Sequence, residues 1–174
     1  MPALQRFHTA GLTKINAANC FTPFTQACPQ LSHIRISMAS QRNLTCAIAA
    51  ALNLPDVPAS LNQMYLEHTW VSPENGDTSP LIPSLPRDLV SLLIKPAAPP
   101  MIAFPGCATV LYHQYMKQLE DLVRICPSGK VRLLPAFKRD LWEVEVYGVE
   151  QAKDDWLSSI KGCMGAWNSG SIAS

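Results

Sequence analysis

Acidic side chains are missing from the first third of this sequence. The first acid is Asp56, so all thirteen Asp and Glu residues lie after residue 55. The basic residues before it are Arg6, Lys14, Arg35 and Arg42. A basic, acid-poor segment that is also rich in serine and threonine is typical of an organelle transit peptide. We therefore expect residues 1–42 to be a transit-peptide-like or disordered segment and the protein to be mitochondrial, with a cytoplasmic protein as the alternative.

Long apolar runs and paired cysteines are also missing. No apolar run reaches the roughly 18 residues that a membrane span needs, so we expect no transmembrane segment. The six cysteines form no C-x-x-C pair, and the four histidines lie far apart in the sequence. This spacing gives no signal for a zinc site. We expect no bound metal and no cofactor.

The common catalytic motifs are absent as well. The chain has no G-x-S-x-G, H-E-x-x-H or Walker sequence, which removes the usual signals for hydrolases and nucleotide-binding enzymes. Its net charge of +1 gives no overall preference for nucleic acid, a membrane surface or an acidic substrate. These absences favour a protein that is not an enzyme, although they do not decide the question.

A clear helical pattern begins at residue 108. Apolar residues recur at spacings of three and four, which places them on one side of a helix. They are Ala108, Leu111, Tyr112, Tyr115, Met116, Leu119, Leu122, Val123 and Cys126. Proline and glycine at 127–129 end the pattern. The sequence therefore predicts an amphipathic helix over residues 108–126.

Strand signals lie on both sides of this helix. Residues 89–94 form a compact apolar run, and residues 130–134 form a short extended run. In residues 141–147, Trp142, Val144 and Val146 alternate with two glutamates, the period of a half-buried strand. Helical spacing then returns at Val149, Ala152, Trp156, Ile160 and Cys163.

These elements predict an α+β fold in the order β-α-β-β-α. Its sheet should have about three strands, and two amphipathic helices should bury their apolar stripes against one face. We expect this domain to span residues 85–164. Residues 43–84 should hold short helices and a proline-rich loop, and residues 165–174 should form a flexible tail.

Basic residues cluster in the predicted hairpin. Lys130 and Arg132 lie in its first strand, and Lys138 and Arg139 lie in its loop beside Phe137. Basic side chains around an exposed ring are what single-stranded nucleic acid binding uses, because charge pairs with phosphate and the ring stacks on a base. The five residues are therefore candidate RNA-binding residues. An ordinary solvated loop fits the same composition.

Residues 88–162 resemble a KH domain. Lys130-Val131-Arg132-Leu133-Leu134-Pro135 is similar to that family's "K-I-R-L-P"-like strand. Glu145-Val146-Tyr147-Gly148 is similar to its strand ending in "V-x-G", and Val149-Glu150-Gln151-Ala152 with Trp156-Leu157 is similar to its alanine-containing last helix. The resemblance implies a non-enzymatic module that binds single-stranded RNA.

The chain departs from that family at its nucleic-acid clamp. The G-x-x-G loop should lie near residues 104–108, where this sequence reads Phe-Pro-Gly-Cys-Ala. The loss of the clamp implies weak RNA binding or a turn to protein contacts. The same order of elements also fits a ferredoxin-like domain of the RNA-recognition-motif shape, although the aromatic sheet motif of that family is absent.

Two alternatives remain. Cys107 stands where a strand and turn (residues 101–106) lead into the predicted helix, and a helix start favours the thiolate. That layout resembles thioredoxin-like enzymes, without their second cysteine and facing proline. The other alternative is a protein-interaction module with no nucleic-acid role. The sequence leaves the ligand and the oligomeric state open.

Overall fold

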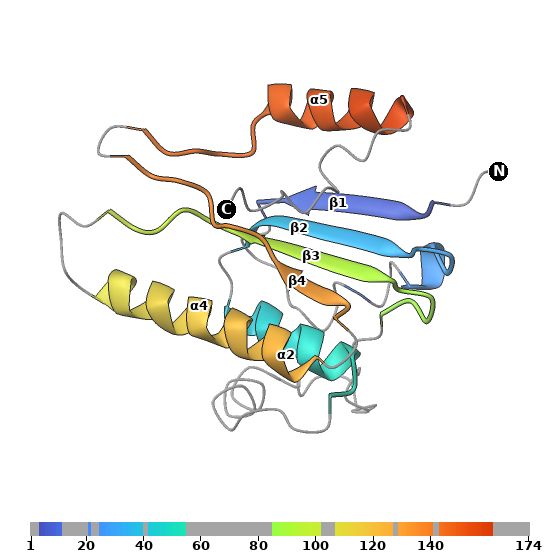
Figure 1. The fold of residues 1–174 in the computed structure, drawn as a ribbon, viewed down its shortest axis with the longest axis horizontal. Helices are drawn as coiled ribbons and strands as arrows, with labels where there is room; N and C mark the ends of the chain where they lie inside the picture. The colour runs from blue at the N-terminus through green and yellow to red at the C-terminus, as the bar shows by residue number, and fades with distance from the viewer. Residues whose placement is uncertain are drawn as a thin grey trace, which may run out of the picture.

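The protein is built on a four-stranded parallel sheet with helices on both sides. The computed structural model describes residues 4–11, 21, 25–39, 42–54, 85–101, 107–126, 129–140 and 143–161. Its strands are β1 (Arg6–Ala10), β2 (His33–Ala39), β3 (Ser91–Pro96) and β4 (Val131–Leu133), and its helices are α2 (Arg42–Ala51), α4 (Cys107–Ile125) and α5 (Val149–Ile160). The strand order is β1-β2-β3-β4, and every neighbouring pair is parallel (Figure 1).

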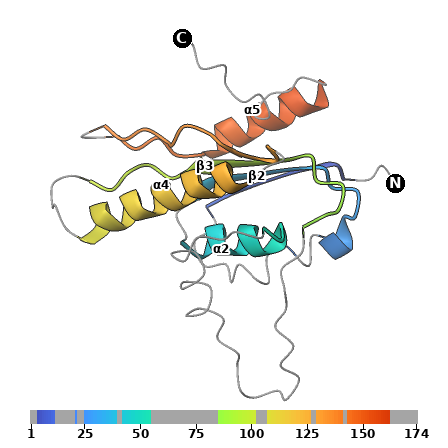
Figure 2. The same cartoon turned by 60° about the horizontal axis from the view of Figure 1, so that its bottom comes forward.

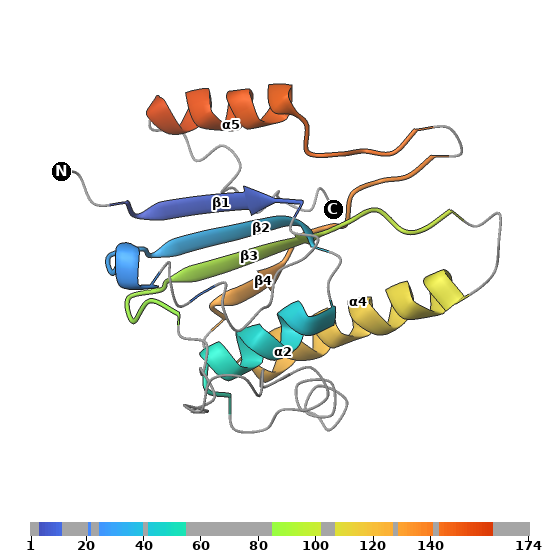
Figure 3. The same cartoon turned by 180° about the vertical axis from the view of Figure 1, so that it is seen from behind.

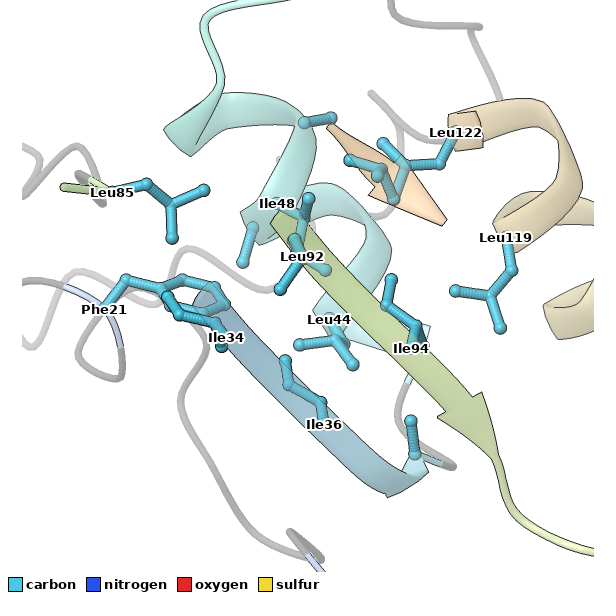
Figure 4. Close-up of a cluster of buried hydrophobic side chains, with 14 of the residues drawn as sticks. Phe21, Ile34, Ile36, Leu44, Ile48, Leu85, Leu92, Ile94, Leu119 and Leu122 are labelled. Atoms are coloured by element: carbon cyan, nitrogen blue, oxygen red, sulfur yellow. The ribbon is translucent and has the colours of Figure 1, made fainter. Parts of the chain in front are cut away.

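One face of the sheet carries the apolar side chains. Alternate residues of a strand point to opposite faces, and the register aligns Ile34 with Leu92 and Leu92 with Val131 across three strands. Helices α2 and α4 cover this face and lie side by side (Figure 3). Figure 4 shows the resulting core, whose labelled side chains are Phe21, Ile34, Ile36, Leu44, Ile48, Leu85, Leu92, Ile94, Leu119 and Leu122.

The predicted long helix is confirmed, with a shift of one residue at each end. Helix α4 runs from Cys107 to Ile125, and Tyr115, Leu119 and Leu122 of its predicted apolar side are buried in the core. The predicted strand at residues 89–94 is also confirmed, as β3. Helix α2 falls largely within residues 43–84, where the sequence predicts short helices.

The first 42 residues are not disordered where the structure describes them. Residues 33–39 form β2, an interior strand bonded to β1 on one side and β3 on the other. The physical reason lies in alternation, because Ile34 and Ile36 face the core while His33, Arg35 and Ser37 face the other way. Part of the acid-free segment is therefore the sheet strand β2, which carries no acidic residue. The transit-peptide assignment stays a prediction.

The predicted hairpin is wrong. Strand β4 pairs in parallel with β3, and residues 143–147 form one isolated bridge, between Val144 and Arg139, instead of a strand. Residues 143–147 cross the sheet on the side away from the core: Glu145 meets Lys95 of β3, and Tyr147 meets His8 of β1. The mixed helix-and-strand class is confirmed, but the sheet has four strands rather than about three.

Helix α5 is present where the sequence predicts it, but its apolar stripe faces solvent. The side chains of Val149 and Trp156 are 82% and 62% exposed, while Gln151, Asp155 and Ser158 are only partly exposed. Figure 2 places α5 on the opposite side of the sheet from α2. That side of the sheet is polar, so the helix turns its polar residues towards it. The expected burial of the stripe is therefore wrong.

Other expectations lie outside the described residues. They concern residues 72–84 of the proline-rich loop predicted over residues 72–86, residues 102–104 of the strand predicted over residues 101–104, and the tail at 165–174. Among the described helices, none is both long and apolar enough to cross a membrane.

Candidate nucleic-acid interface

The sheet face opposite the core is polar and basic, and we call it the polar face. Its members come from alternate positions of all four strands and from the residue before β4. They are Arg6, His8, His33, Arg35, Ser37, Lys95, Lys130 and Arg132. None of the four strands in the described part of the chain carries an acidic residue. The backbone register therefore gathers positive charge that is scattered widely along the sequence.

Rows of side chains run across this face. One row joins His8, Arg35, Leu93 and Arg132, and another joins Arg6, His33 and Ser91. Neighbouring strands are about 4.8 Å apart, so Arg132 lies about 10 Å from Arg35 along the first row. The register thus sets basic residues of different strands close together on one face of the sheet.

The amino-terminal part of the polar face is open to solvent. Arg6 and Arg132 are exposed, and His33 and Lys130 are half-buried. Burial lowers the pKa of His33, and the charge of Arg6 lowers it further. The neutral imidazole at physiological pH can donate or accept a hydrogen bond, and a bound phosphate would favour its protonation.

The carboxyl-terminal part of the polar face is covered by a chain of hydrogen bonds. The Tyr147 hydroxyl donates to Asp155 Oδ2 at 2.8 Å and lies 3.1 Å from His8 Nδ1. His8 Nε2 lies 2.9 Å from Ser37 Oγ, which receives the Arg35 Nε–H at 3.2 Å. Because the single Tyr147 proton goes to Asp155, His8 donates through Nδ1 and accepts from Ser37 through Nε2.

The electrostatics of this covered part are set by burial and by one carboxylate. The pKa of His8 is lowered to about 4, chiefly by burial and then by the Arg35 charge, while Asp155 opposes both. Burial also lowers the pKa of Arg35, against the opposing effects of Asp155 and Tyr147. Burial and the bond to Asp155 raise the pKa of Tyr147. Asp155 therefore acts electrostatically on both His8 and Arg35.

A hydroxyl bonded to an oriented imidazole is the arrangement that activates catalytic serines. Met38, directly after Ser37, has φ of +56° at an irregularity in the β2–β3 pairing, and such conformations concentrate at functional sites. However, Ser37 is 0% exposed and already accepts a bond from Arg35. In this conformation the chain of bonds fixes the Tyr147 segment to the sheet and presents no nucleophile.

The predicted RNA-binding residues divide into two groups. Lys130 and Arg132 lie on the polar face, whereas Lys138 and Arg139 lie beyond the carboxyl end of β4, where Glu145 Oε2 accepts the Lys138 N–H at 2.9 Å. That bond contributes most to the lowered pKa of Glu145, and the Lys95 charge contributes further. The structure therefore does not bring the four cations into one patch.

Phe137 is not the exposed ring that stacking requires. It is 1% exposed, and Lys95 Nζ lies 3.8 Å from its ring centroid, a cation–π distance. The same lysine bonds Glu145 at 3.3 Å. Because β4 pairs with β3 instead of turning back as a hairpin, Phe137 folds over the end of β3 and bonds Pro96 through its backbone.

The structure bears differently on the cysteine and metal expectations. Helix α4 begins at Cys107, as predicted, but the Cys107 side chain lies outside the described part of the chain, so the thiol-enzyme alternative stays a prediction. Within the described ranges, no three His, Cys, Asp or Glu side chains gather as metal ligands.

The sequence predicts Lys130 and Arg132 but none of the other residues of the polar face, and neither Tyr147 nor Asp155, which cover its carboxyl-terminal part. The signal for Arg35 and Ser37 was present, because β2 reads His-Ile-Arg-Ile-Ser, a polar–apolar alternation of period two. His8, Tyr147 and Asp155 gave no local signal, because their contacts join the two ends of the chain.

Comparison with known proteins adds no relative. No protein-family model, no curated protein and no solved structure matches this chain. The resemblance to KH domains therefore stays a prediction.

Proposed function

We propose that the polar face binds single-stranded RNA through its phosphodiester backbone. The observation that carries this proposal is the register, which sets Lys130 and Arg132 of the predicted site on one face with Arg6 and His33. Phosphate contacts from arginine and lysine supply most of the affinity in non-specific nucleic-acid binding. The four described strands bring no carboxylate to this face, and Glu145 and Asp155 meet it at Lys95 and through Tyr147. The exposed basic residues Arg6 and Arg132 therefore concentrate positive charge locally although the net charge is only +1.

The affinity for RNA should depend on the phosphate charges more than on the base sequence. Among the side chains of the polar face, none is an exposed aromatic ring, and Leu93 between Arg35 and Arg132 is 2% exposed. Base stacking on the sheet is therefore not expected, in contrast to the stacking role that the sequence predicts for Phe137. Affinity should vary little between oligonucleotides of equal length and fall steeply with salt.

Arg132→Gln should weaken the binding of a short oligouridylate about fivefold at low salt, because one phosphate contact is lost. The slope of log K against log salt should become shallower by about 0.7, the contribution of one single-strand phosphate. Fluorescence anisotropy of the labelled RNA, titrated with the full chain over a series of salt concentrations, measures both.

The matched control is Arg124→Gln. Arg124 is an exposed arginine of α4, its side chain 75% exposed, on the core side of the sheet, and it pairs with Asp121 at 2.7 Å. The Arg124→Gln variant loses the same charge away from the polar face, so its affinity for the RNA should stay near that of the unaltered protein. Equal losses for both variants, or no binding by the unaltered protein, would refute the proposal.

The exposed stripe of α5 favours one second candidate, a protein-interaction module. Val149 and Trp156 present apolar area to solvent, which on a folded protein commonly marks a contact surface. If a second copy of this chain covers the stripe, sedimentation will show self-association at high protein concentration, and Trp156→Gln will abolish it. Concentration-independent sedimentation of the unaltered protein would count against that form of the module.

A further inference from the structure

Helix α5 is held on the polar face by polar contacts, and its apolar side does not pack against the sheet. The Tyr147 hydroxyl, just before the helix, links Asp155 of α5 to His8 of β1. The apolar residues Val149 and Trp156 point away from the sheet. Burial of apolar area is the main force that holds helices on sheets, so α5 can leave the sheet without uncovering the core.

The groups beneath α5 are those of an anion site. Arg35 is 6% exposed, yet it carries a guanidinium on the polar face, next to the Ser37 hydroxyl and the His8 imidazole. A guanidinium with neighbouring hydrogen-bond donors is a common phosphate-binding arrangement. In this structure the carboxylate of Asp155 supplies the negative charge that acts on Arg35 and His8.

We propose that α5 is a displaceable cap, and that Asp155 and Tyr147 occupy a second phosphate subsite formed by His8, Arg35 and Ser37. The proposal rests on the proposed function and extends it. A nucleic-acid phosphate and the Asp155 carboxylate compete for the same guanidinium and its neighbouring hydrogen-bonding groups, so a phosphate in this second subsite and closure of the cap exclude each other. With the cap displaced, Arg35 continues the row that leads through Leu93 to the exposed Arg132, and one strand of RNA spans both.

For RNA that occupies the second subsite, the apparent affinity equals the intrinsic affinity multiplied by the fraction of molecules whose cap is open. Asp155→Asn removes the competing charge and keeps the shape of the side chain. It should bind a short oligouridylate about tenfold more tightly than the unaltered protein. Tyr147→Phe, which removes the hydroxyl between His8 and Asp155, should also tighten binding.

The chain offers a matched control in Asp154→Asn. Asp154 is the neighbouring residue, it is exposed, and its replacement changes the net charge by the same amount. Its affinity should stay within about twofold of the unaltered protein, because a distant charge acts only through screened, long-range attraction.

Amide hydrogen exchange gives a second readout on the same proteins. Addition of the oligouridylate should speed exchange in residues 149–160 and leave residues 109–125 of α4 protected, which shows that the fold persists. Asp155→Asn should produce the faster exchange in 149–160 without RNA, and Asp154→Asn should not.

The outcomes separate the cap from the RNA-binding proposal. If the unaltered protein binds RNA but Asp155→Asn and Asp154→Asn have equal affinities, the cap is refuted and the RNA-binding face stands. If none of the proteins binds the oligouridylate, both proposals fail. If the unaltered protein binds the oligouridylate, and Asp155→Asn and Tyr147→Phe bind it more tightly than Asp154→Asn does, both proposals are supported.

Discussion

Ile36→Ala should lower the free energy of unfolding by about 3 kcal/mol, within the range for truncation of a buried isoleucine. Ile36 lies in β2, is 1% exposed and pairs with Thr9 and Ile94 in the neighbouring strands. Its side chain packs in the core beneath α2 and α4 (Figure 4). The loss combines less buried apolar area with a cavity that the two flanking strands prevent from closing. Urea unfolding of the purified full chain, followed by circular dichroism, measures it.

The control for this change is Ile125→Ala, the same truncation at the half-buried last residue of α4. It should cost about 1 kcal/mol, since part of that side chain already contacts water. If residues 1–42 were disordered, Ile36→Ala would leave the free energy of unfolding unchanged. An unchanged free energy would therefore contradict the sheet order. Cleavage of a presequence after residue 42 would likewise remove β1 and β2 together.

Acidification from pH 6.5 to 4 should destabilise the protein through His8. The pKa of His8 falls from an ordinary 6.5 to about 4 in the folded protein, first because of burial and then because of Arg35. Between these values the unfolded chain binds a proton that the folded one does not, so stability decreases as the pH falls through this window. Because the ring is only partly buried, water screens the effect, and we expect a loss on the order of 2 kcal/mol.

His8→Gln isolates this contribution. The variant should be less stable than the unaltered protein at pH 7, since the bonds to Tyr147 and Ser37 are disturbed, and its stability should change less between pH 6.5 and 4. His113→Gln alters an exposed histidine of α4 and should leave the pH dependence as it was. His33 acts in the same direction as His8, because its pKa is also lowered. Parallel stability curves for His8→Gln and the unaltered protein would show that His8 is not the titrating group.

The parts of the fold that could be predicted are those with a local signal. The apolar stripe of α4 and the short run of β3 are visible within a few turns of chain, and both were placed correctly. The sequence also predicts helix α5 correctly from its amphipathic period. Such a period shows which residues share one side of the helix, but it does not show which side packs against the sheet. The side of the helix that meets the protein depends on β1 and β2, which lie more than a hundred residues away.

The pairing of strands was the harder problem. Residues 130–134 and 141–147 are close in sequence, which favours a hairpin, yet the edge of β3 takes β4 in parallel. Parallel pairing leaves no turn signature, because the strands are joined by a helix. The alternation of polar and apolar residues in β2 is a strand signal, but the acid-poor composition of residues 1–42 favours a transit-peptide-like or disordered segment instead. Two residues of the polar face, Lys130 and Arg132, could be found from charge alone, whereas the placement of Arg35 and Asp155 required the sheet.

The all-parallel sheet also affects how fast the protein can fold. Every strand pair is joined by a long connection, so no two strands can form a quick local hairpin before the rest of the domain gathers. On the ribosome, β1 and β2 emerge first, with the edge that β3 will take still bare. The sheet is complete only once Leu133 has emerged, and the Tyr147 and Asp155 contacts to His8 form later still. Folding should therefore be slow and late, and the nascent chain should depend on chaperones that shield unpaired strand edges.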